Sequence, residues 1–282
     1  NGAKPTSHAD LDAVMNAAVT PAALARTLER EVIPRLMVAH RRQRSSSAAG
    51  SAHGRTESAE VVAFTDLIMA PEMSGAFESV ARRRAGNVSL ESIYLDLLMP
   101  AARRLSDLWE ADLCHYEEIA IGMLHLQQVL RELSPEFSDE SECRPHGPKA
   151  LLLSAPGEQS MLGVYMVTEF HRCLTAEFFH RAGWEVWRAP PRSRAQLLDV
   201  VGSNWFDVID ISATCEGRLP QLVTDLADLR KVSRNSRVGM MIGGQVFDEH
   251  PELADCLGAD ACACDPRAAL AHAEMLVTLR ER

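Results

Sequence analysis

The spacing of hydrophobic residues changes character near the middle of the chain. In the first half, apolar residues recur every three or four positions, as in helices that bury one face. This spacing predicts helices over 61–69, 73–84 and 89–108, and a further helix with the stripe Ile119, Met123, Leu126, Leu130 and Leu133. Ser89 is expected to cap the third helix, and Pro100 to kink it. Residues 59–137 are therefore predicted to form a helical bundle.

Short apolar runs alternate with helical segments after an acidic linker at 138–148 that contains Pro and Gly. Runs of strand length occupy 150–155, 185–189, 208–213, 238–243 and 259–264. Helical patterns occupy 162–181, 193–202, 219–233, 249–257 and 267–279. This alternation is typical of a doubly wound parallel sheet. The predicted second domain, 149–282, is thus a flavodoxin-like α/β domain with a five-stranded parallel sheet.

The remaining residues, 1–58, are predicted to hold one helix and a flexible linker. Thr20 is a suitable N-cap and Pro21 a suitable first helical residue. Residues 45–58 are rich in Ser, Ala and Gly, a composition typical of flexible linkers. A tethered helix of this kind either docks on a partner or a second copy, or folds back on its own bundle.

Composition narrows the class of protein. The formal net charge of −10 argues against general binding to the phosphate backbone of nucleic acids. No apolar run approaches the roughly 18 residues of a membrane-spanning helix, and the N-terminus lacks the apolar core of a signal peptide. We therefore expect a cytoplasmic protein without membrane contact. Among the 7 cysteines, strand alternation predicts that Cys262 and Cys264 are both buried in the core.

The loops that follow the predicted strands are the expected functional positions, because ligands of parallel sheets bind at the carboxyl ends of the strands. Small or polar residues follow three of these strands: Gly157, Glu158, Gln159, Ser160 and Gly163 after the first, Ser212 and Thr214 at the third, and Gly243 and Gly244 at the fourth. Glycines at a strand end either let a bulky ligand approach the backbone or only make a turn.

Three common chemistries lack their sequence motifs. The first loop contains no G-x-G-x-x-G, the phosphate cradle of dinucleotide-binding folds, and the chain contains no G-x-x-x-x-G-K-[ST] for nucleotide hydrolysis. Ser160 does not stand in the G-x-S-x-G context of a nucleophilic serine.

Residues 105–113, LSDLWEADL, together with the polar loop, Ser212 and the Gly pair, resemble the cobalamin-binding module of B12-dependent methionine synthase and of CarH-type light-responsive regulators. In that family the loop reads D/E-x-H-x-x-x-G. Glu158 matches the acidic position, Ser160 stands where the histidine would be, and Gly163 comes one residue early. The resemblance implies that Trp109 covers the upper face of the corrin ring, and that the strand-end residues hold the cofactor.

A more specific resemblance covers roughly residues 89–279. The segments LWEADLCHYEEIAIGMLHLQQVLRELSPEF, SAPGEQSMLG and RAGWEVW are similar to AerR/PpaA antirepressors and to the C-terminal part of AppA, which are described as sensors of cobalamin or heme. The resemblance implies a non-enzymatic antirepressor that responds to light or redox state. It further implies a tetrapyrrole ligand, adenosyl- or hydroxocobalamin in the first place and heme as the alternative, and a PpsR/CrtJ-type repressor of photosynthesis genes as the partner.

Ser160 is the main departure from the family, because a hydroxyl is a poor ligand to cobalt or to heme iron. Cobalamin would keep its own base, or another side chain would coordinate the metal; the candidates are His115, His171 and His180. His171 lies in a segment, 171–178, that extends the helix beyond the family's usual length. Two alternatives stay open: a corrinoid carrier of a methyltransferase system, which predicts the missing histidine, and an interaction module without a ligand, which Ser160 favours.

Overall fold

Helices form the first part of the structure, a computed structural model that describes residues 58–139, 147–156, 162–188, 193–214, 216–250, 253–254 and 257–281. They are α4 (Ala59–Met69), α5 (Ser74–Ala85), a continuous run of α6 (Leu90–Ile93), η2 (Tyr94–Leu98) and α7 (Met99–Glu110), and α8 (Tyr116–Asp139). Helix α4 packs on α7 and α8. The predicted helical bundle is present, whereas the predictions on residues 1–57 and on the linker residues 140–146 lie outside the described residues.

The run from α6 to α7 shows how the chain accommodates Pro100. Ser89 caps the run as predicted, since its Oγ accepts a hydrogen bond from the Ser92 backbone N–H at 3.1 Å. The segment η2 is a π-helix, and Pro100 stands in the first turn of α7 directly after it. A proline lacks a backbone N–H and its ring collides with the preceding turn of a regular α-helix. The wider π-helical turn avoids this conflict at the position where the sequence predicts a kink.

The second part is a five-stranded sheet in which every strand pair is parallel. The strands are β1 (Lys149–Ser154), β2 (Glu185–Arg188), β3 (Val208–Ser212), β4 (Gly239–Gly243) and β5 (Ala261–Ala263), in the spatial order β2-β1-β3-β4-β5. This is the flavodoxin-like order, so the predicted fold class is confirmed. Ser154, Ser212, Gly243 and Ala263 occupy one register row across β1, β3, β4 and β5.

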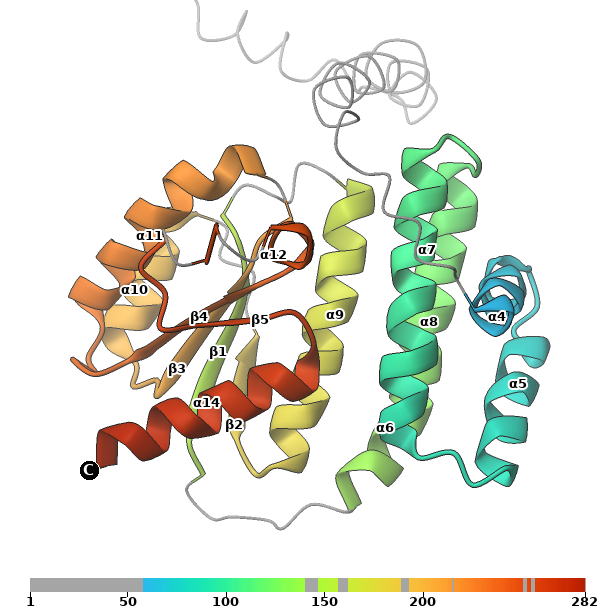
Figure 1. Cartoon of the computed structure of the whole chain (residues 1–282), viewed down its shortest axis with the longest axis horizontal. Coiled ribbons are helices and arrows are strands. Elements are labelled where there is room, and N and C mark those ends of the chain that lie inside the picture. Colours follow the sequence, from blue (N-terminus) through green and yellow to red (C-terminus); the bar gives the residue numbers. More distant parts are fainter. Residues whose placement is uncertain are drawn as a thin grey trace, which may run out of the picture. The chain divides into compact units, whose positions relative to one another are not determined.

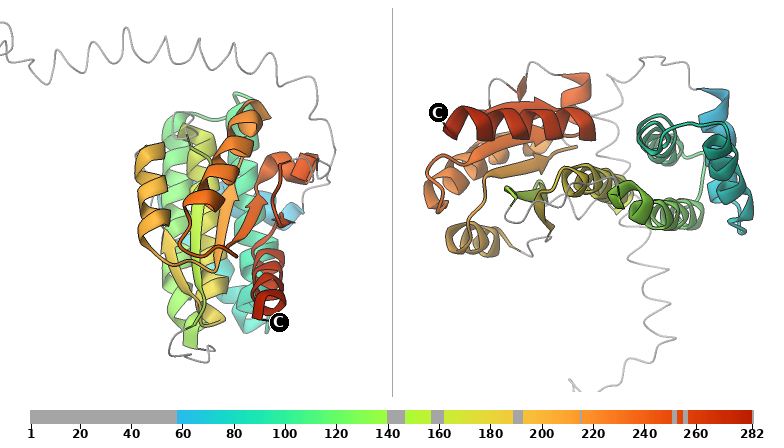
Figure 2. Two further views of the ribbon diagram at one scale, coloured as in Figure 1. Left: turned by 90° about the vertical axis from the view of Figure 1, so that its left-hand side faces the viewer. Right: turned by 90° about the horizontal axis from the view of Figure 1, so that it is seen from below.

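Helices cover both faces of the sheet (Figure 2). On one face α9 (Leu162–Arg181) and α14 (Pro266–Glu281) bury Phe179 and Ala273 against the strands. On the other face lie α10 (Arg194–Ser203), α11 (Leu219–Val232) and α12 (Gln245–Glu249). The helix predicted over 249–257 is helical at its described residues 253–254, but the prediction missed α12, which begins at Gln245 because Val246 and Phe247 turn back at once from β4 into the core.

Helix α9 belongs to both halves of the described chain (Figure 1). Phe170, Leu174 and Phe178 enter the core of the helical bundle, while Ala176 and Phe179 enter the core against the sheet. Phe137 of α8 meets the Phe178 ring at a centroid distance of 5.2 Å. Residues 57–282 form one compact unit, so the bundle and the sheet are packed together rather than tethered.

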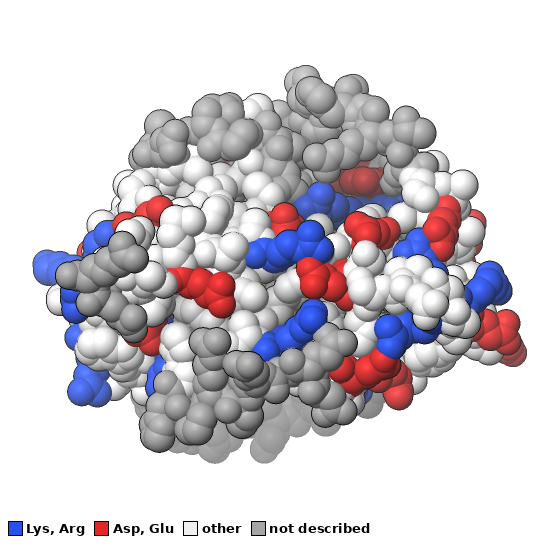
Figure 3. Space-filling model, turned by 60° about the horizontal axis from the view of Figure 1, so that its bottom comes forward, with Lys and Arg blue, Asp and Glu red and all other residues white. Residues whose placement is uncertain are grey.

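The surface carries mixed charge. On the face shown in Figure 3, Lys and Arg side chains alternate with Asp and Glu, and no broad basic tract is visible. Within the described ranges, no helix is both long enough and apolar enough to cross a lipid bilayer.

Candidate functional site

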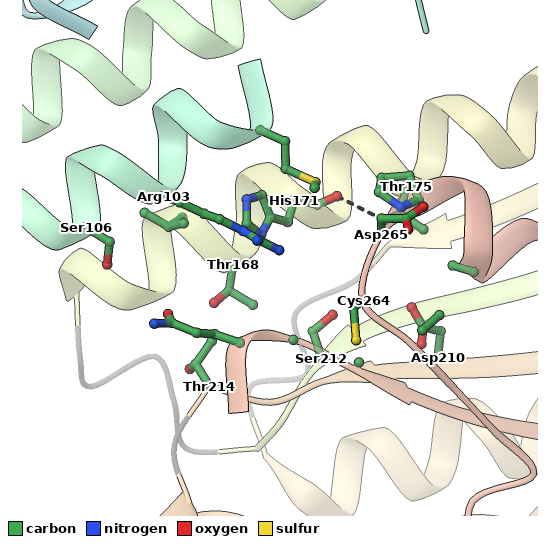
Figure 4. A pocket seen from close by; sticks show the side chains of 18 residues that line it. Arg103, Ser106, Thr168, His171, Thr175, Asp210, Ser212, Thr214, Cys264 and Asp265 are labelled. Atoms are coloured by element: carbon green, nitrogen blue, oxygen red, sulfur yellow. Dashed lines mark hydrogen bonds between the residues drawn. The ribbon is translucent and has the colours of Figure 1, made fainter. Parts of the chain in front are cut away.

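A cavity of about 50 Å³ opens at the carboxyl ends of β3, β4 and β5. Its walls come from four places in the chain: Arg103 and Ser106 on α7, Thr168 and His171 on α9, the strand ends, and the start of α14 (Figure 4). The site lies beside the point where the strand order reverses, between β1 and β3, which is where open parallel sheets bind their ligands. A volume of this size admits a few water molecules or one small substituent of a larger ligand.

His171 presents a buried nitrogen to this cavity. Its Nε2 atom is buried and has no hydrogen-bond partner among the described residues. Burial, reinforced by the charge of Arg103 and opposed by a hydrogen bond to the Met99 backbone, lowers the pKa of His171 from 6.5 to about 4. The imidazole is therefore neutral at physiological pH, the form in which a ring nitrogen can accept a hydrogen bond or bind a metal.

Asp210 is a buried carboxylate on the opposite wall. It stands on β3 in register with Leu152 and Met241, and only 7% of its surface is exposed. No hydrogen bond or ion pair reaches its side chain from the described part of the chain, and burial alone raises its pKa from 3.8 to about 6. A buried polar group without a partner is uncommon in folded proteins and calls for an explanation such as a ligand.

His171 and Asp210 are expected to make stability depend on pH with opposite signs. The lowered pKa of His171 means that its contribution is lost as pH falls from 6.5 to about 4. The raised pKa of Asp210 means that the folded protein holds a proton that the unfolded chain releases, so stability is lost as pH rises from 3.8 to about 6. In the wild-type protein the two effects partly cancel.

Asp210→Asn should remove one of these two effects. The unfolding free energy of the variant minus that of the wild type should rise by on the order of 2 kcal/mol from about pH 4 to pH 7, because only the wild type loses stability through Asp210. For His171→Gln the unfolding free energy of the variant minus that of the wild type should fall over this range, because only the wild type gains stability through His171. Urea unfolding at several pH values measures both, and parallel curves for all three proteins would contradict the assignment.

Five of the sequence-predicted residues meet in this cavity: His171, Ser212, Thr214, Gly243 and Gly244. The two glycines also have a structural reason. A Cβ atom on Gly243 would come closer than 3.0 Å to the Ala263 carbonyl oxygen, and one on Gly244 would collide in the same way with Ala213. Next to Ser212 on β1, Ser154 is buried and its Oγ has no described hydrogen-bond partner. The small residues that the sequence predicted at the strand ends thus lie together along one side of the cavity.

Other candidate residues lie elsewhere. Trp109, near the end of α7, packs on the bundle core and meets Tyr116 edge-on at a centroid distance of 6.3 Å, and it does not line the cavity. His115 is exposed just before α8, where its backbone N–H donates to Glu118 Oε2 at 2.7 Å. His180 is exposed near the end of α9. Gly163 lies in the first turn of α9, while Gly157, Glu158, Gln159 and Ser160 lie outside the described residues.

The structure also adds residues that the sequence reasoning missed, namely Arg103, Thr168 and Asp210. Asp210 had a visible signal, since it interrupts the apolar strand VIDIS. The prediction that Cys264 is buried in the core is wrong: β5 ends at Ala263, so strand alternation no longer applies, and the Cys264 side chain is exposed and lines the cavity. Cys262 is half-buried.

The described residues include no group of three or more His, Cys, Asp or Glu side chains that could hold a metal ion.

Comparison with known proteins identifies a relative by sequence and proteins of similar fold among solved structures. No protein-family model matches the chain. It is 26% identical, over 185 residues, to an uncharacterized 20.5 kDa protein in the bchF-crtJ intergenic region of Rhodobacter capsulatus, and the match covers 64% of this chain and 90% of the relative.

Among solved structures, the chain is similar to the monomethylamine corrinoid protein of Methanosarcina barkeri, with a TM-score of 0.59, 15% identity, and coverage of 77% of this chain and 96% of that protein. A cobalamin-binding protein from Desulfitobacterium hafniense aligns over 78% of this chain and 97% of that protein with 14% identity and a TM-score of 0.39. The chain thus has the fold of a corrinoid protein, a helical bundle packed on a five-stranded parallel sheet.

Proposed function

We propose that this protein is a non-enzymatic regulator that binds a corrinoid, cobalamin in the first place, between α7 and the carboxyl ends of the strands. In response to light or redox state it would relieve repression by a PpsR/CrtJ-type repressor of photosynthesis genes. The observation that carries the proposal is the cavity beside the switch point of the sheet, walled by the helical bundle on one side and lined by buried polar atoms without partners.

The residues in the cavity fit a corrinoid. The ring of a corrinoid is fringed by amide side chains, which both donate and accept hydrogen bonds. The Nε2 atom of the neutral His171 imidazole and the Asp210 carboxylate have no hydrogen-bond partner among the described residues, and such a fringe can supply one. The cavity is too small for the ring itself, so only a substituent enters it. When bound, a corrinoid supplies a cobalt centre whose upper ligand can be released by light.

Of the three histidine candidates for the metal, His171 is the one in the cavity. His115 and His180 are exposed and do not line it. His171, and not the position of Ser160, is therefore the histidine that would face a bound cofactor, and it would hold the metal if the ring settles against the opening of the cavity. Heme iron would use the same imidazole, so His171 alone does not separate the two tetrapyrroles.

The sequence resemblance and the gene position of a relative support the proposed partner. The Rhodobacter capsulatus relative is encoded in the bchF-crtJ intergenic region, next to crtJ, which supports a role near a CrtJ-type repressor. A regulator of this kind needs a ligand that favours one arrangement of the helical bundle over another. Helix α9 suits this requirement, because it lines the cavity and packs on both halves of the protein.

Reconstitution tests the ligand. Purified protein is mixed in the dark with hydroxocobalamin or adenosylcobalamin, with hemin in a parallel sample, and passed through a desalting column. We expect a cobalamin to co-elute with a shifted visible spectrum, and illumination to change affinity for the purified repressor in a pull-down. Colourless protein after all three treatments would favour the ligand-free interaction module instead.

His171→Gln should weaken the complex and change its colour. Loss of the imidazole should lower the affinity for hydroxocobalamin by about tenfold or more and return its absorption bands toward those of the free cofactor. His180→Gln, the same change at an exposed site of the same helix, is the matched control and should bind as the wild type does. Equal affinities and spectra for both variants would rule out His171 as a metal ligand.

The fold of the Methanosarcina barkeri protein makes a corrinoid carrier the second candidate. A carrier presents its cobalt to a separate methyltransferase and cycles between methylated and free forms. The cobalamin complex is reduced to cob(I)alamin with titanium(III) citrate and incubated with methanol or a methylamine and the matching methyltransferase, and methylcobalamin is followed by its absorption. In a carrier, cob(I)alamin would take the methyl group, and water or the amine would leave. We expect no methylation; repeated turnover would replace the regulator by the carrier.

A further inference from the structure

We propose that Asp210 selects the ligand: its carboxylate accepts hydrogen bonds from an N–H or O–H group of a neutral or cationic substituent, and it disfavours a substituent that carries a carboxylate. This inference rests on the proposed function and makes it more specific. The amide-fringed corrinoid meets the requirement, whereas heme brings two propionates.

Asp210 is buried on a central strand without a partner among the described residues, which is unusual for a carboxylate that only stabilises a fold. The other deeply buried aspartate among the described residues, Asp225, is 2% exposed and is paired through one oxygen: its Oδ1 accepts hydrogen bonds from Arg194 at 2.7 Å and from Gln221 at 3.1 Å, while its Oδ2 has no partner. Asp210 has no such partner among the described residues, although it lies on the central strand of the sheet. A buried carboxylate that stabilises the fold is expected to have a hydrogen-bond or ion-pair partner. Asp210 has none among the described residues, and its side chain lines the cavity.

The charges around the cavity are distributed unevenly. Its titratable lining residues are Arg103, His171, Asp210, Cys264 and Asp265. Arg103 lies on α7 beside His171, on the far side of the cavity from Asp210 (Figure 4). Asp265 accepts a hydrogen bond from the Ala268 backbone N–H at 2.9 Å and caps α14. A further cation close to Asp210 is Arg172 on α9, which donates to the carbonyl oxygen of Leu152, the β1 residue in register with Asp210, at 3.0 Å. Among the described residues that line the cavity, Asp210 thus shares its side with the acidic Asp265, and the lining cation Arg103 lies across from it.

An anionic substituent on this wall would be buried beside a carboxylate. Two carboxylates that share a buried site cannot both stay ionised without a large cost. An amide N–H or a hydroxyl would instead form a charge-assisted hydrogen bond with Asp210, stronger than a bond between neutral groups. The raised pKa of the side chain is consistent with this reading, since the carboxylate is desolvated and its partner is missing.

The test compares two tetrapyrroles on three proteins. Wild type, Asp210→Ala and Asp210→Asn are titrated with hydroxocobalamin and with hemin at neutral pH, with binding followed by visible absorption. Wild type should prefer hydroxocobalamin. Asp210→Ala should lose about 10- to 100-fold in affinity for hydroxocobalamin, the effect of one hydrogen bond to a charged group. In Asp210→Asn, whose amide can also donate, the preference over hemin should shrink by about tenfold or more.

The controls separate recognition from folding. Asp96→Asn makes the same change of charge at an exposed site of η2, and it should leave both affinities unchanged. Thermal unfolding of each variant shows that the fold is intact. A ratio of affinities that stays at the wild-type value in both Asp210 variants would overturn the inference while leaving the corrinoid function in place. Wild type that prefers hemin would overturn it too, and wild type that binds neither ligand would overturn both proposals.

Discussion

Gly244→Ala is expected to lower the free energy of unfolding by more than about 4 kcal/mol, enough to leave little folded protein. Gly244 has φ 106° and ψ 171°, a backbone conformation that is essentially confined to glycine. An added Cβ would in addition lie closer than 3.0 Å to the backbone of Ala213. Because the obstacle is main chain, no side-chain rotation relieves it, and β3 and β4 would have to separate at the site.

Two other glycines separate the causes of this effect. Gly258 has φ 75° but nothing within 4 Å of an added Cβ, so Gly258→Ala isolates the conformational cost, about 1 kcal/mol. Gly243 has no positive φ, but its Cβ would collide with the Ala263 carbonyl oxygen, so Gly243→Ala isolates the collision. Urea unfolding monitored by circular dichroism should show the smallest loss of unfolding free energy for Gly258→Ala, a larger loss for Gly243→Ala and the largest for Gly244→Ala. If the Gly244 variant were as stable as the Gly258 variant, β3 and β4 would be able to move apart at this site at little cost in free energy.

Phe137→Ala should cost about 3–5 kcal/mol. The Phe137 ring is fully buried and contacts Tyr94 at a centroid distance of 4.7 Å and Phe178 at 5.2 Å, while the Arg181 guanidinium lies 4.6 Å from its centre. These partners belong to η2 and α9, so the ring joins the helical bundle to the first helix of the sheet domain. Truncation leaves a cavity at that junction and removes the cation–π contact.

The control is Phe77→Ala, the same truncation at a half-buried ring on α5. It should cost less than half as much, because solvent already reaches the ring. Both values come from urea unfolding. If Phe77→Ala and Phe137→Ala lowered the unfolding free energy equally, the contacts of Phe137 would stabilise the protein no more than those of a half-buried ring.

Local patterns in the sequence predicted most of the fold. The bounds of α9 agree with the predicted 162–181, and each predicted strand is present within a few residues. These elements carry their own signals, a period of 3.6 or a short apolar run. The π-helical turn before Pro100 and the short helix α12 had no such signal, because both depend on how the chain packs against neighbours distant in sequence.

The site was predicted less completely, for a related reason. Ser212 and Gly243 could be found because the carboxyl ends of adjacent parallel strands meet at one edge. Arg103 could not, since its place depends on which face of α7 turns toward the sheet, and that is fixed by packing between the two halves. Asp210 was detectable as a charge inside an apolar strand, but an argument confined to strand ends passes over it.

The double role of α9 also bears on how the protein is made. The chain emerges from the ribosome with its N-terminal part first. When α8 has been synthesised, the bundle still lacks Phe170, Leu174 and Phe178, which complete its core. The side of Phe137 and its apolar neighbours that α9 covers therefore stays exposed until translation has passed Arg181. The strands β2 and β3, which pair with β1, are synthesised later still. A nascent chain stalled before that point displays an open hydrophobic face, the kind of surface that molecular chaperones bind.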